Sequence, residues 1–242
     1  MKNYRDEVIQ ELRRTGAFLS GGHFKLVSGN HSDSYVHVRL ALSYSDVAAK
    51  FAKMIADEFK EEKIDAIFGF TVGGIRLAEA IAWHLNKSVL LGKKEGDKIE
   101  FVGGFDARPR QSILIVDDVL TTGGLISRSI SMILGLGCEV AGIAVVVDRS
   151  IEALDFGVKA VRLAKVDFRH YTPNQCPMCL SGRPPLIDLS NPEINPYPVL
   201  ETLPAEQRDR LAKTFMEIIE KVHGEGTVSL REFVAKIKRS EL

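Results

Sequence analysis

The sequence of 242 residues has few cysteines, no net charge and no long hydrophobic run. Its three cysteines are too few for a disulfide framework in a chain of this length. The 32 basic and 32 acidic side chains cancel, so no overall field favours nucleic acid or a membrane surface. No apolar run approaches the ~20 residues that a membrane helix needs, and the first residues lack the apolar core of a signal peptide. These absences predict a cytoplasmic protein whose anion sites are local.

Two common nucleotide-binding motifs are also missing. The chain has no Gly-Lys-Ser/Thr ending of a nucleoside-triphosphate P-loop and no Gly-x-Gly-x-x-Gly at a first strand–helix turn. Both absences argue against the usual sites for nucleoside triphosphates and dinucleotides. A phosphate site in this chain must use a different loop.

The most informative stretch joins an apolar strand at residues 113–116 to a helix that starts near residue 125. Between them lie two acids and then small hydroxyl residues and glycines: Asp117, Asp118, Val119, Leu120, Thr121, Thr122, Gly123 and Gly124. Backbone N–H groups of such a loop can surround a phosphate, and the helix N-terminus adds a favourable dipole. The acids can accept hydrogen bonds from sugar hydroxyls or from the water around Mg²⁺. We therefore predict a ribose-phosphate site, since an ordinary strand–turn–helix would explain the glycines but not two acids.

The hydrophobic pattern predicts an α/β fold in which helices flank a parallel sheet. Strand-length apolar runs occur at residues 66–70, 88–91, 113–116 and 141–147. Helical spacing occurs at residues 8–12, 47–59, 75–85 and 125–134. Ser45 and Asp46 are candidate caps for the second of these helices. Parallel sheets covered by helices bind ligands beyond the carboxyl ends of their strands, so the loops there should meet at one edge.

Two other groups would reach the same edge. Gly73 and Gly74 would let backbone N–H groups approach a pyrophosphate, and a tight turn into the next helix is the alternative explanation. Lys93, Lys94 and Lys98 lie in a polar stretch with several glycines. They could neutralise a departing pyrophosphate, or they could be solvated surface.

The Asp-Asp-Val-x-Thr-Thr-Gly sequence resembles the phosphoribosyl-pyrophosphate (PRPP) motif of type I phosphoribosyltransferases. Within that family the likeness is greatest to orotate phosphoribosyltransferases, because three more segments fit in order. Residues 23–35 resemble the N-terminal stretch over the base, residues 93–104 the mobile catalytic loop, and residues 147–149 the strand end whose arginine holds the orotate carboxylate. The resemblance covers residues 17–183, and it implies the type I fold with an N-terminal hood.

The resemblance also implies an activity, which is transfer of ribose 5-phosphate from PRPP to orotate. The products would be orotidine 5′-monophosphate and pyrophosphate. The residues implied as catalytic are Lys93, Lys94, Lys98, Asp117 and Asp118. The residues implied in substrate binding are Gly73, Gly74, Arg149, Tyr35 and residues 117–124. Mg²⁺ would be held through PRPP and water near the two aspartates, and the chain would form a homodimer.

Several alternatives stay open at this stage. Arg149 could hold a carboxylate through its forked guanidinium or form a structural salt bridge, and Tyr35 could stack on a base or pack in the hood. The enzyme could accept another purine or pyrimidine base. The chain could also be a PRPP-binding regulator without turnover, because a fold and a motif do not establish catalysis.

Cys176 and Cys179 form a Cys-x-x-Cys pair with His170 six residues before it. A structural zinc site normally has four ligands, so this half site would have to be completed across a dimer. A thioredoxin-type pair would open a helix after a strand, whereas the flanking prolines favour a loop. We therefore expect two reduced thiols in a turn.

Three regions follow from composition. Residues 1–172 should form the phosphoribosyltransferase domain with its hood, and residues 173–203, rich in Pro and Asn, a connector that contains the Cys-x-x-Cys pair. Residues 204–242 should form a helical extension, with amphipathic spacing over residues 211–222 and 229–237.

Overall fold

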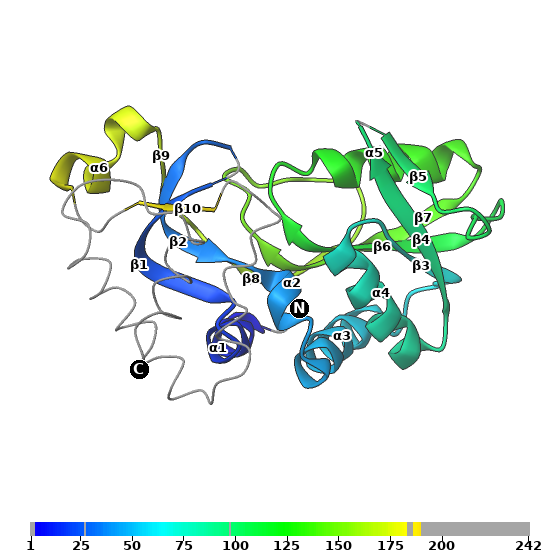
Figure 1. Cartoon of the computed structure of the whole chain (residues 1–242). Helices are drawn as coiled ribbons and strands as arrows, with labels where there is room; N and C mark the ends of the chain where they lie inside the picture. Colours follow the sequence, from blue (N-terminus) through cyan, green and yellow to red (C-terminus); the bar gives the residue numbers. More distant parts are fainter. Residues whose placement is uncertain (1–2, 27, 97, 183–185, 190–242) are drawn as a thin grey trace. The chain divides into compact units, whose positions relative to one another are not determined.

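A computed structural model describes residues 3–26, 28–96, 98–182 and 186–189 (Figure 1). The chain divides into two compact units. The sheet unit comprises residues 1–17 and 37–167, and the hood unit comprises residues 18–36 and 168–242. The predicted helical extension lies outside the described residues, and the boundaries expected at residues 172 and 203 stay a prediction.

Within the described residues, the sheet unit contains a six-stranded sheet in the order β5-β4-β3-β6-β7-β8. Neighbouring strands are parallel from β4 to β8, and the edge strand β5 runs antiparallel to β4. The strands are β3 (Ala66–Gly69), β4 (Ser88–Glu95), β5 (Lys98–Phe101), β6 (Ser112–Leu120), β7 (Glu139–Asp148) and β8 (Ala160–Lys165). The central strands are buried on both faces, which explains their continuous apolar runs.

Helices cover both faces of this sheet (Figure 1). α4 (Val72–Leu85) connects β3 to β4 and packs beside α3 (Ser45–Phe59), whereas α5 (Gly124–Gly135) connects β6 to β7 on the opposite face. The two crossovers lead in opposite directions along the sheet, so the strand order switches between β3 and β6. Such a switch point opens a crevice at the carboxyl ends of the strands, where ligands bind in α/β sheets.

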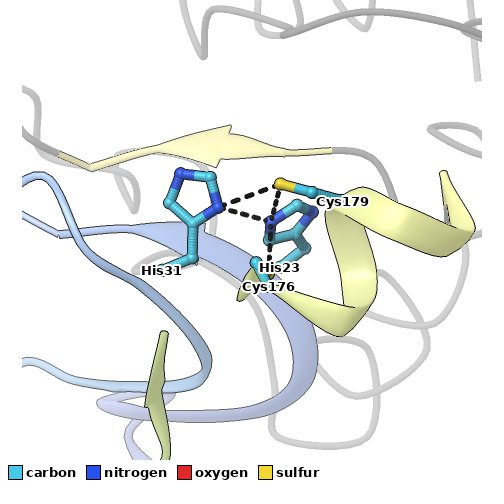
Figure 2. A group of neighbouring side chains, drawn as sticks. All are labelled: His23, His31, Cys176 and Cys179. Carbon is cyan, nitrogen blue, oxygen red and sulfur yellow. Dashed lines mark hydrogen bonds between the residues drawn. The ribbon is translucent and has the colours of Figure 1, made fainter. Parts of the chain in front are cut away.

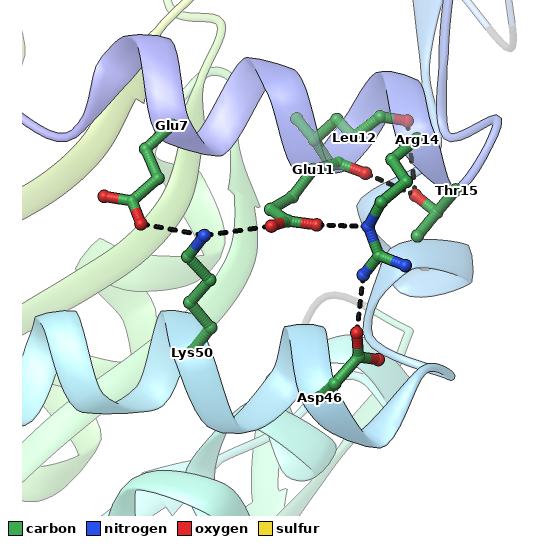
Figure 3. Close-up of polar contacts among 7 residues, drawn as sticks. All are labelled: Glu7, Glu11, Leu12, Arg14, Thr15, Asp46 and Lys50. Carbon is green, nitrogen blue, oxygen red and sulfur yellow. Dashed lines mark hydrogen bonds and ion pairs between the residues drawn. The ribbon is translucent and has the colours of Figure 1, made fainter.

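An ion-pair network joins α3 to the first helix, α1 (Arg5–Arg14) (Figure 3). Lys50 Nζ lies 2.8 Å from Glu7 Oε1 and 2.9 Å from Glu11 Oε1. Arg14 bridges Glu11 and Asp46 with contacts of 2.6 Å each. These pairs are partly exposed, so their main effect is to set the register of the two helices while the buried apolar faces supply the stability.

The hood unit contains a small sheet in the order β10-β1-β2-β9 within the described residues. β1 (Phe18–Lys25) and β2 (His31–Val36) form an antiparallel hairpin. β9 (His170–Tyr171) pairs with β2, and β10 (Ile187–Asp188) pairs with β1. A 3₁₀ turn, η1 (Pro173–Gln175), and the short helix α6 (Pro177–Ser181) follow β9. Two segments far apart in the sequence therefore share one sheet.

The predicted α/β fold with a parallel sheet flanked by helices is confirmed. The capping prediction for α3 was wrong, because Tyr44 is the N-cap, makes no side-chain cap bond, and leaves Ser45 and Asp46 inside the first turn. Among the described residues, no helix combines the length and apolar character that crossing a membrane would require.

Candidate active site

The two aspartates lie inside the end of β6 rather than in the loop after it. Pairing with β7 continues from Asp117, opposite Val145, to Leu120, opposite Asp148. The prediction that the strand stops at residue 116 was therefore wrong, because ladder hydrogen bonds to β7 outweigh the low strand propensity of aspartate. Asp117 is only 4% exposed. The acids are held by the sheet and do not move with the loop.

Asp117 is also tied to the start of α4. Thr71 Oγ1 donates a hydrogen bond to Asp117 Oδ1 at 2.5 Å, and the backbone N–H of Asp118 donates to the same oxygen at 2.9 Å. Thr71 is the N-cap of α4, where its hydroxyl oxygen accepts the N–H of Gly74 at 2.9 Å. One hydroxyl group thus connects the ends of β3 and β6 at the switch point.

Gly73 and Gly74 lie in the first turn of α4. A Cβ atom at Gly73 would lie 2.3 Å from Asp118 Cγ, and one at Gly74 would lie 2.9 Å from the carbonyl oxygen of Val116. Glycine is therefore needed for α4 to begin directly against β6. The first N–H groups of a helix lack acceptors within it, which suits an anion. Pyrophosphate binding by this turn stays a prediction.

The pKa values of both acids are raised. Burial, and next the charge of Asp118, raise the pKa of Asp117 well above its ordinary value. Burial also raises the pKa of Asp118, against the opposing effects of its hydrogen bond with Asp117 and of the Arg39 charge. Ionising two adjacent carboxyls in a poorly solvated site is costly, so loss of both protons is shifted to higher pH than for free carboxyls.

Arg39 is a charged group near this pair that the sequence pattern did not identify. It belongs to the short helix α2 (Val38–Ala41), which lies against β6. Its positive charge lowers the pKa of Asp118 and so opposes the effect of burial. No spacing in the sequence connects Arg39 with Asp118, because tertiary packing alone brings them together.

The turn from β6 to α5 has the form expected for a phosphate loop. Thr121 and Thr122 are exposed, and Gly123 is the N-cap of α5 with φ = 75°. A side chain at Gly123 would be strained by that φ, and its Cβ would lie 2.9 Å from Leu154 Cδ1. Gly124 begins the helix. Hydroxyl groups and helical N–H groups are therefore available together at the end of the strand that carries the acids.

The lysines lie on a β-hairpin and not in a loop. β4 continues through Glu95 and β5 begins at Lys98, so Lys93 and Lys94 are paired strand residues. The loop predicted from residue 93 was therefore wrong over this segment. The missed signal is the alternation in β5, where Ile99 is buried between exposed neighbours.

The hairpin separates the three lysines onto two faces. Lys93 and Lys98 share one face with Glu95 and Glu100. Lys93 Nζ lies 2.6 Å from Glu95 Oε2, so its charge is partly offset. Lys94 lies on the other face, the side of β5 that packs toward α5. The three lysines are therefore not equivalent candidates for pyrophosphate.

Arg149 directly follows β7, as predicted. Its backbone N–H donates to the carbonyl oxygen of Leu120 at 2.8 Å, which places it beside the end of β6. The preceding acid, Asp148, is the buried partner of Arg162 and Lys165, each at 3.3 Å. Asp148 therefore forms ion pairs at this strand end. A contact between Arg149 and orotate stays a prediction.

Tyr35 lies half-buried on β2 of the hood unit. Its ring centroid is 6.2 Å from that of Phe24, with the planes tilted by 40°. This contact supports packing in the hood, and stacking of Tyr35 on a base stays a prediction.

The Cys-x-x-Cys pair has an environment that the sequence did not reveal. Cys176 and Cys179 are free thiols that meet His23 and His31 of the hairpin (Figure 2). His170 is instead part of β9, paired with β2. The expected loop was wrong, because Cys176 is the N-cap of α6 and proline is favoured at the first position of a helix. Burial raises the pKa of the Cys179 thiol, which does not favour a thioredoxin-type nucleophile.

The switch point thus combines a buried acid pair, two helix N-termini and exposed threonine hydroxyls. Such groups can hold a ribose and its phosphate. Among the described residues, three or more metal-binding side chains do not meet at this point. A magnesium ion there would take its other ligands from phosphate and water, which fits its preference.

Comparison with known proteins identifies relatives of this chain. A family model described as phosphoribosyl transferase domain matches residues 42–171. An orotate phosphoribosyltransferase of Desulforamulus reducens is 34% identical over 180 residues, or 74% of this chain and 94% of that protein. The orotate phosphoribosyltransferase of Pelotomaculum thermopropionicum is 35% identical over 180 residues, which are 74% of this chain and 94% of that protein.

Solved structures agree with the fold. The crystal structure of orotate phosphoribosyltransferase from Aeropyrum pernix matches with a TM-score of 0.56 and 27% identity, and the match covers 66% of this chain and 93% of that one. The Mycobacterium tuberculosis orotate phosphoribosyltransferase in complex with Fe(III) dicitrate matches with a TM-score of 0.54 and 25% identity, over 67% and 97% of the two chains.

Proposed function

This chain belongs to the phosphoribosyltransferase family, and from that premise we propose that it is an orotate phosphoribosyltransferase. It transfers ribose 5-phosphate from PRPP to orotate and releases pyrophosphate. The observation that carries the proposal is the acid pair at the end of β6, with Asp117 buried and Asp118 half-buried, followed directly by the phosphate-type turn into α5. The names of the relatives that align over most of their length support orotate as the base.

In the proposed mechanism, residues 121–124 hold the 5-phosphate and the acid pair holds the ribose hydroxyls. The raised pKa values of the two carboxyls favour the protonated form, and a protonated carboxyl can donate as well as accept a hydrogen bond. A ring nitrogen of orotate bonds to C1 of the ribose while the bond from C1 to the pyrophosphate oxygen breaks. The electron pair leaves with pyrophosphate, and the proton of that nitrogen passes to pyrophosphate or to water. Negative charge on the acid pair stabilises the positive character that develops on the ribose.

The leaving group requires positive charge that the acid pair cannot supply. The first turn of α4 offers backbone N–H groups, and Lys94 lies on the face of the hairpin toward α5. Mg²⁺ would be held by PRPP and water near Asp117 and Asp118, and when bound it offsets the charge of pyrophosphate. Arg149 supplies the forked donor for the orotate carboxylate.

The proposal is tested by measuring pyrophosphate release from PRPP with orotate, uracil, hypoxanthine, guanine, xanthine and adenine in separate reactions. Turnover with orotate and background release with the others supports it. Turnover with a different base assigns another phosphoribosyltransferase activity. PRPP binding by calorimetry with no turnover for any base assigns a regulator instead.

The proposal also includes a homodimer in the cytoplasm. In the orotate phosphoribosyltransferases that this chain resembles, the segment corresponding to residues 93–104 often contributes to the active site of the neighbouring subunit. The hairpin lysines would then complete the active site of the partner. Light scattering after size exclusion tests the dimer. Activity above the mean of the two variants on mixing an Asp118→Asn protein with a Lys94→Ala protein tests whether sites are shared.

A further inference from the structure

Four metal-binding side chains of the hood unit converge on one point (Figure 2). Their ligand atoms are His23 Nε2, His31 Nδ1, Cys176 Sγ and Cys179 Sγ, and all lie within 4.8 Å of one another. His23, His31 and Cys176 are at most 4% exposed. The cluster lies within the hood unit alone, so one chain supplies every ligand.

Four of the six separations between ligand atoms are close to those of a tetrahedral zinc site, and the other two are within 4.8 Å. Zinc–sulfur bonds of about 2.3 Å and zinc–nitrogen bonds of about 2.0–2.1 Å at tetrahedral angles put sulfur about 3.5 Å from nitrogen and two nitrogens about 3.3 Å apart. His23 Nε2 lies 3.4 Å from Cys176 Sγ and 3.5 Å from Cys179 Sγ. His31 Nδ1 lies 3.2 Å from Cys179 Sγ and 3.0 Å from His23 Nε2.

Hydrogen bonding alone does not explain this convergence. A ring nitrogen of histidine has either one proton or one lone pair, so it makes one good hydrogen bond. His23 Nε2 instead faces three partners at once, namely His31 Nδ1 and the two sulfur atoms. A central cation would bind all four atoms simultaneously, with both thiols deprotonated.

The fold explains how residues so far apart in the sequence converge. His31 is the cross-strand partner of Lys25, and the register of β1 shifts between Ser20 and Phe24, the stretch that contains His23. His23 lies beside His31, with 3.0 Å between Nε2 and Nδ1. Lys25 is itself engaged by Asp188 of β10 at 2.9 Å. Cys176 caps α6 and Cys179 lies one turn later, so both thiols project from the same end of that helix.

We propose that His23, His31, Cys176 and Cys179 bind one structural zinc ion in each chain. Four protein ligands complete a tetrahedral shell and leave no open position for a substrate, so the ion is structural and not catalytic. It joins the β1–β2 hairpin to the segment that follows β9, which is also connected to the hairpin by short strand pairs and by the Lys25–Asp188 ion pair. The half site that the Cys-x-x-Cys pair suggests is therefore completed within the chain and not across a dimer.

The first test is metal analysis of the full-length protein after dialysis against metal-free buffer. Inductively coupled plasma mass spectrometry should find about one zinc per chain. Cys176→Ser and His31→Asn should each lower zinc affinity at least tenfold. Loss of a direct ligand costs at least as much affinity as loss of a residue that only orients a ligand. The matched controls are Cys138→Ser and His84→Asn, which lie in the sheet unit and should retain full zinc.

A second test uses the unaltered protein and so does not depend on the folding of any variant. Co²⁺ added after zinc removal should give the visible absorption of a tetrahedral site with sulfur ligands, and zinc should displace it. Removal of zinc by a chelator should expose two more thiols to a thiol reagent. Neither test requires substrate, so the zinc site and the proposed activity can fail separately.

Three results would overturn the proposal. The first is wild-type protein without zinc that also gives no Co²⁺ spectrum. The second is equal loss of zinc in Cys138→Ser and Cys176→Ser. The third is a disulfide between Cys176 and Cys179 in metal-free protein from reducing cells, which would assign a redox pair instead.

Discussion

The sheet unit and the hood unit are stabilised by different means. The sheet unit has a continuous apolar core in which Phe68, Ile113 and Val145 are fully buried. The described part of the hood unit buries few apolar side chains, namely Phe24, Leu26, Val36, Ile187 and Leu189, together with Cys176. Small sheets of this kind need an added constraint, such as a metal.

This difference changes what a polar residue does in each unit. In the sheet unit, the acids and threonines sit at an edge that the apolar core already holds in place. They are therefore free to serve a ligand. In the hood unit, His23, His31 and Cys176 are buried where a core would lie, and the exposed Cys179 meets them. Substitution should therefore impair activity in the first unit and folding in the second.

The largest effect should follow loss of a zinc ligand. We expect Cys176→Ser to raise amide hydrogen exchange in residues 18–26 and 168–182 by roughly 100-fold or more, because metal binding and folding of a small unit are coupled. Exchange in β3, β6 and β7 should not change. Mass spectrometry of peptides measures both, with Cys138→Ser as the control. Equal exchange in both variants would contradict the comparison of the two units.

The second-largest effect is expected for substitution in the acid pair. Asp118→Asn should lower the turnover number by about 10²–10³, the usual cost of losing a group that stabilises transition-state charge. The protein should stay folded, because the apolar core of the sheet unit is intact. The matched control is Asp148→Asn at the end of the neighbouring strand. Asp148 serves Arg162, Lys165 and Ser150, so this change should lower the unfolding temperature with little effect on turnover.

A smaller effect is expected for Arg149→Ala. Loss of a charged hydrogen bond of about 1.5–3 kcal/mol should raise the Michaelis constant for orotate roughly 10- to 100-fold while PRPP binding is retained. Arg149→Lys should give a Michaelis constant for orotate between those of wild type and Arg149→Ala, because an ammonium group cannot reproduce the forked guanidinium. Steady-state kinetics decide the matter. Unchanged orotate kinetics would exclude Arg149 from the base site and leave the PRPP site intact.

The hairpin lysines should differ from one another by several-fold. Lys94→Ala should reduce turnover more than Lys93→Ala, because Lys93 is already paired with Glu95 and shares its face with acids. If the lysines act on the leaving group, turnover should fall more than PRPP affinity. Comparison of both kinetic constants in the two variants checks this. Identical small losses would indicate that the hairpin is solvated surface.

The smallest effect concerns pH and stability. Burial raises the pKa of Asp117 in the folded protein, so the folded state binds more protons than the unfolded state above the ordinary carboxyl value. Stability from this group is present at low pH and is lost as the pH rises through the raised pKa. Asp117→Asn, whose amide oxygen can still accept from Thr71, should therefore lose less stability than wild type as the pH rises from about 4. The free energy of unfolding of both proteins can be measured with urea at each pH. An equal change with pH in the two proteins would contradict this prediction.

Much of the sheet unit can be predicted from local pattern. The apolar runs at β3, β6 and β7 and the helical spacing of α4 and α5 identify buried parallel strands and their crossovers. The order of these elements places the acids, the phosphate turn and Arg149 at one edge. β5 was missed because charged residues surround Ile99, and the strand ending of β6 was misplaced because pairing with β7 decides it.

The sequence by itself determined the α/β fold and the turn of two acids, threonines and glycines between a strand and a helix, because both depend on residues close together in the chain. Only the tertiary structure decided that Thr71 holds Asp117 and that His23 and His31 meet Cys176 and Cys179. Each of these contacts joins residues whose separation has no fixed period. Strand pairing and helix packing bring them together, and no local spacing encodes that result.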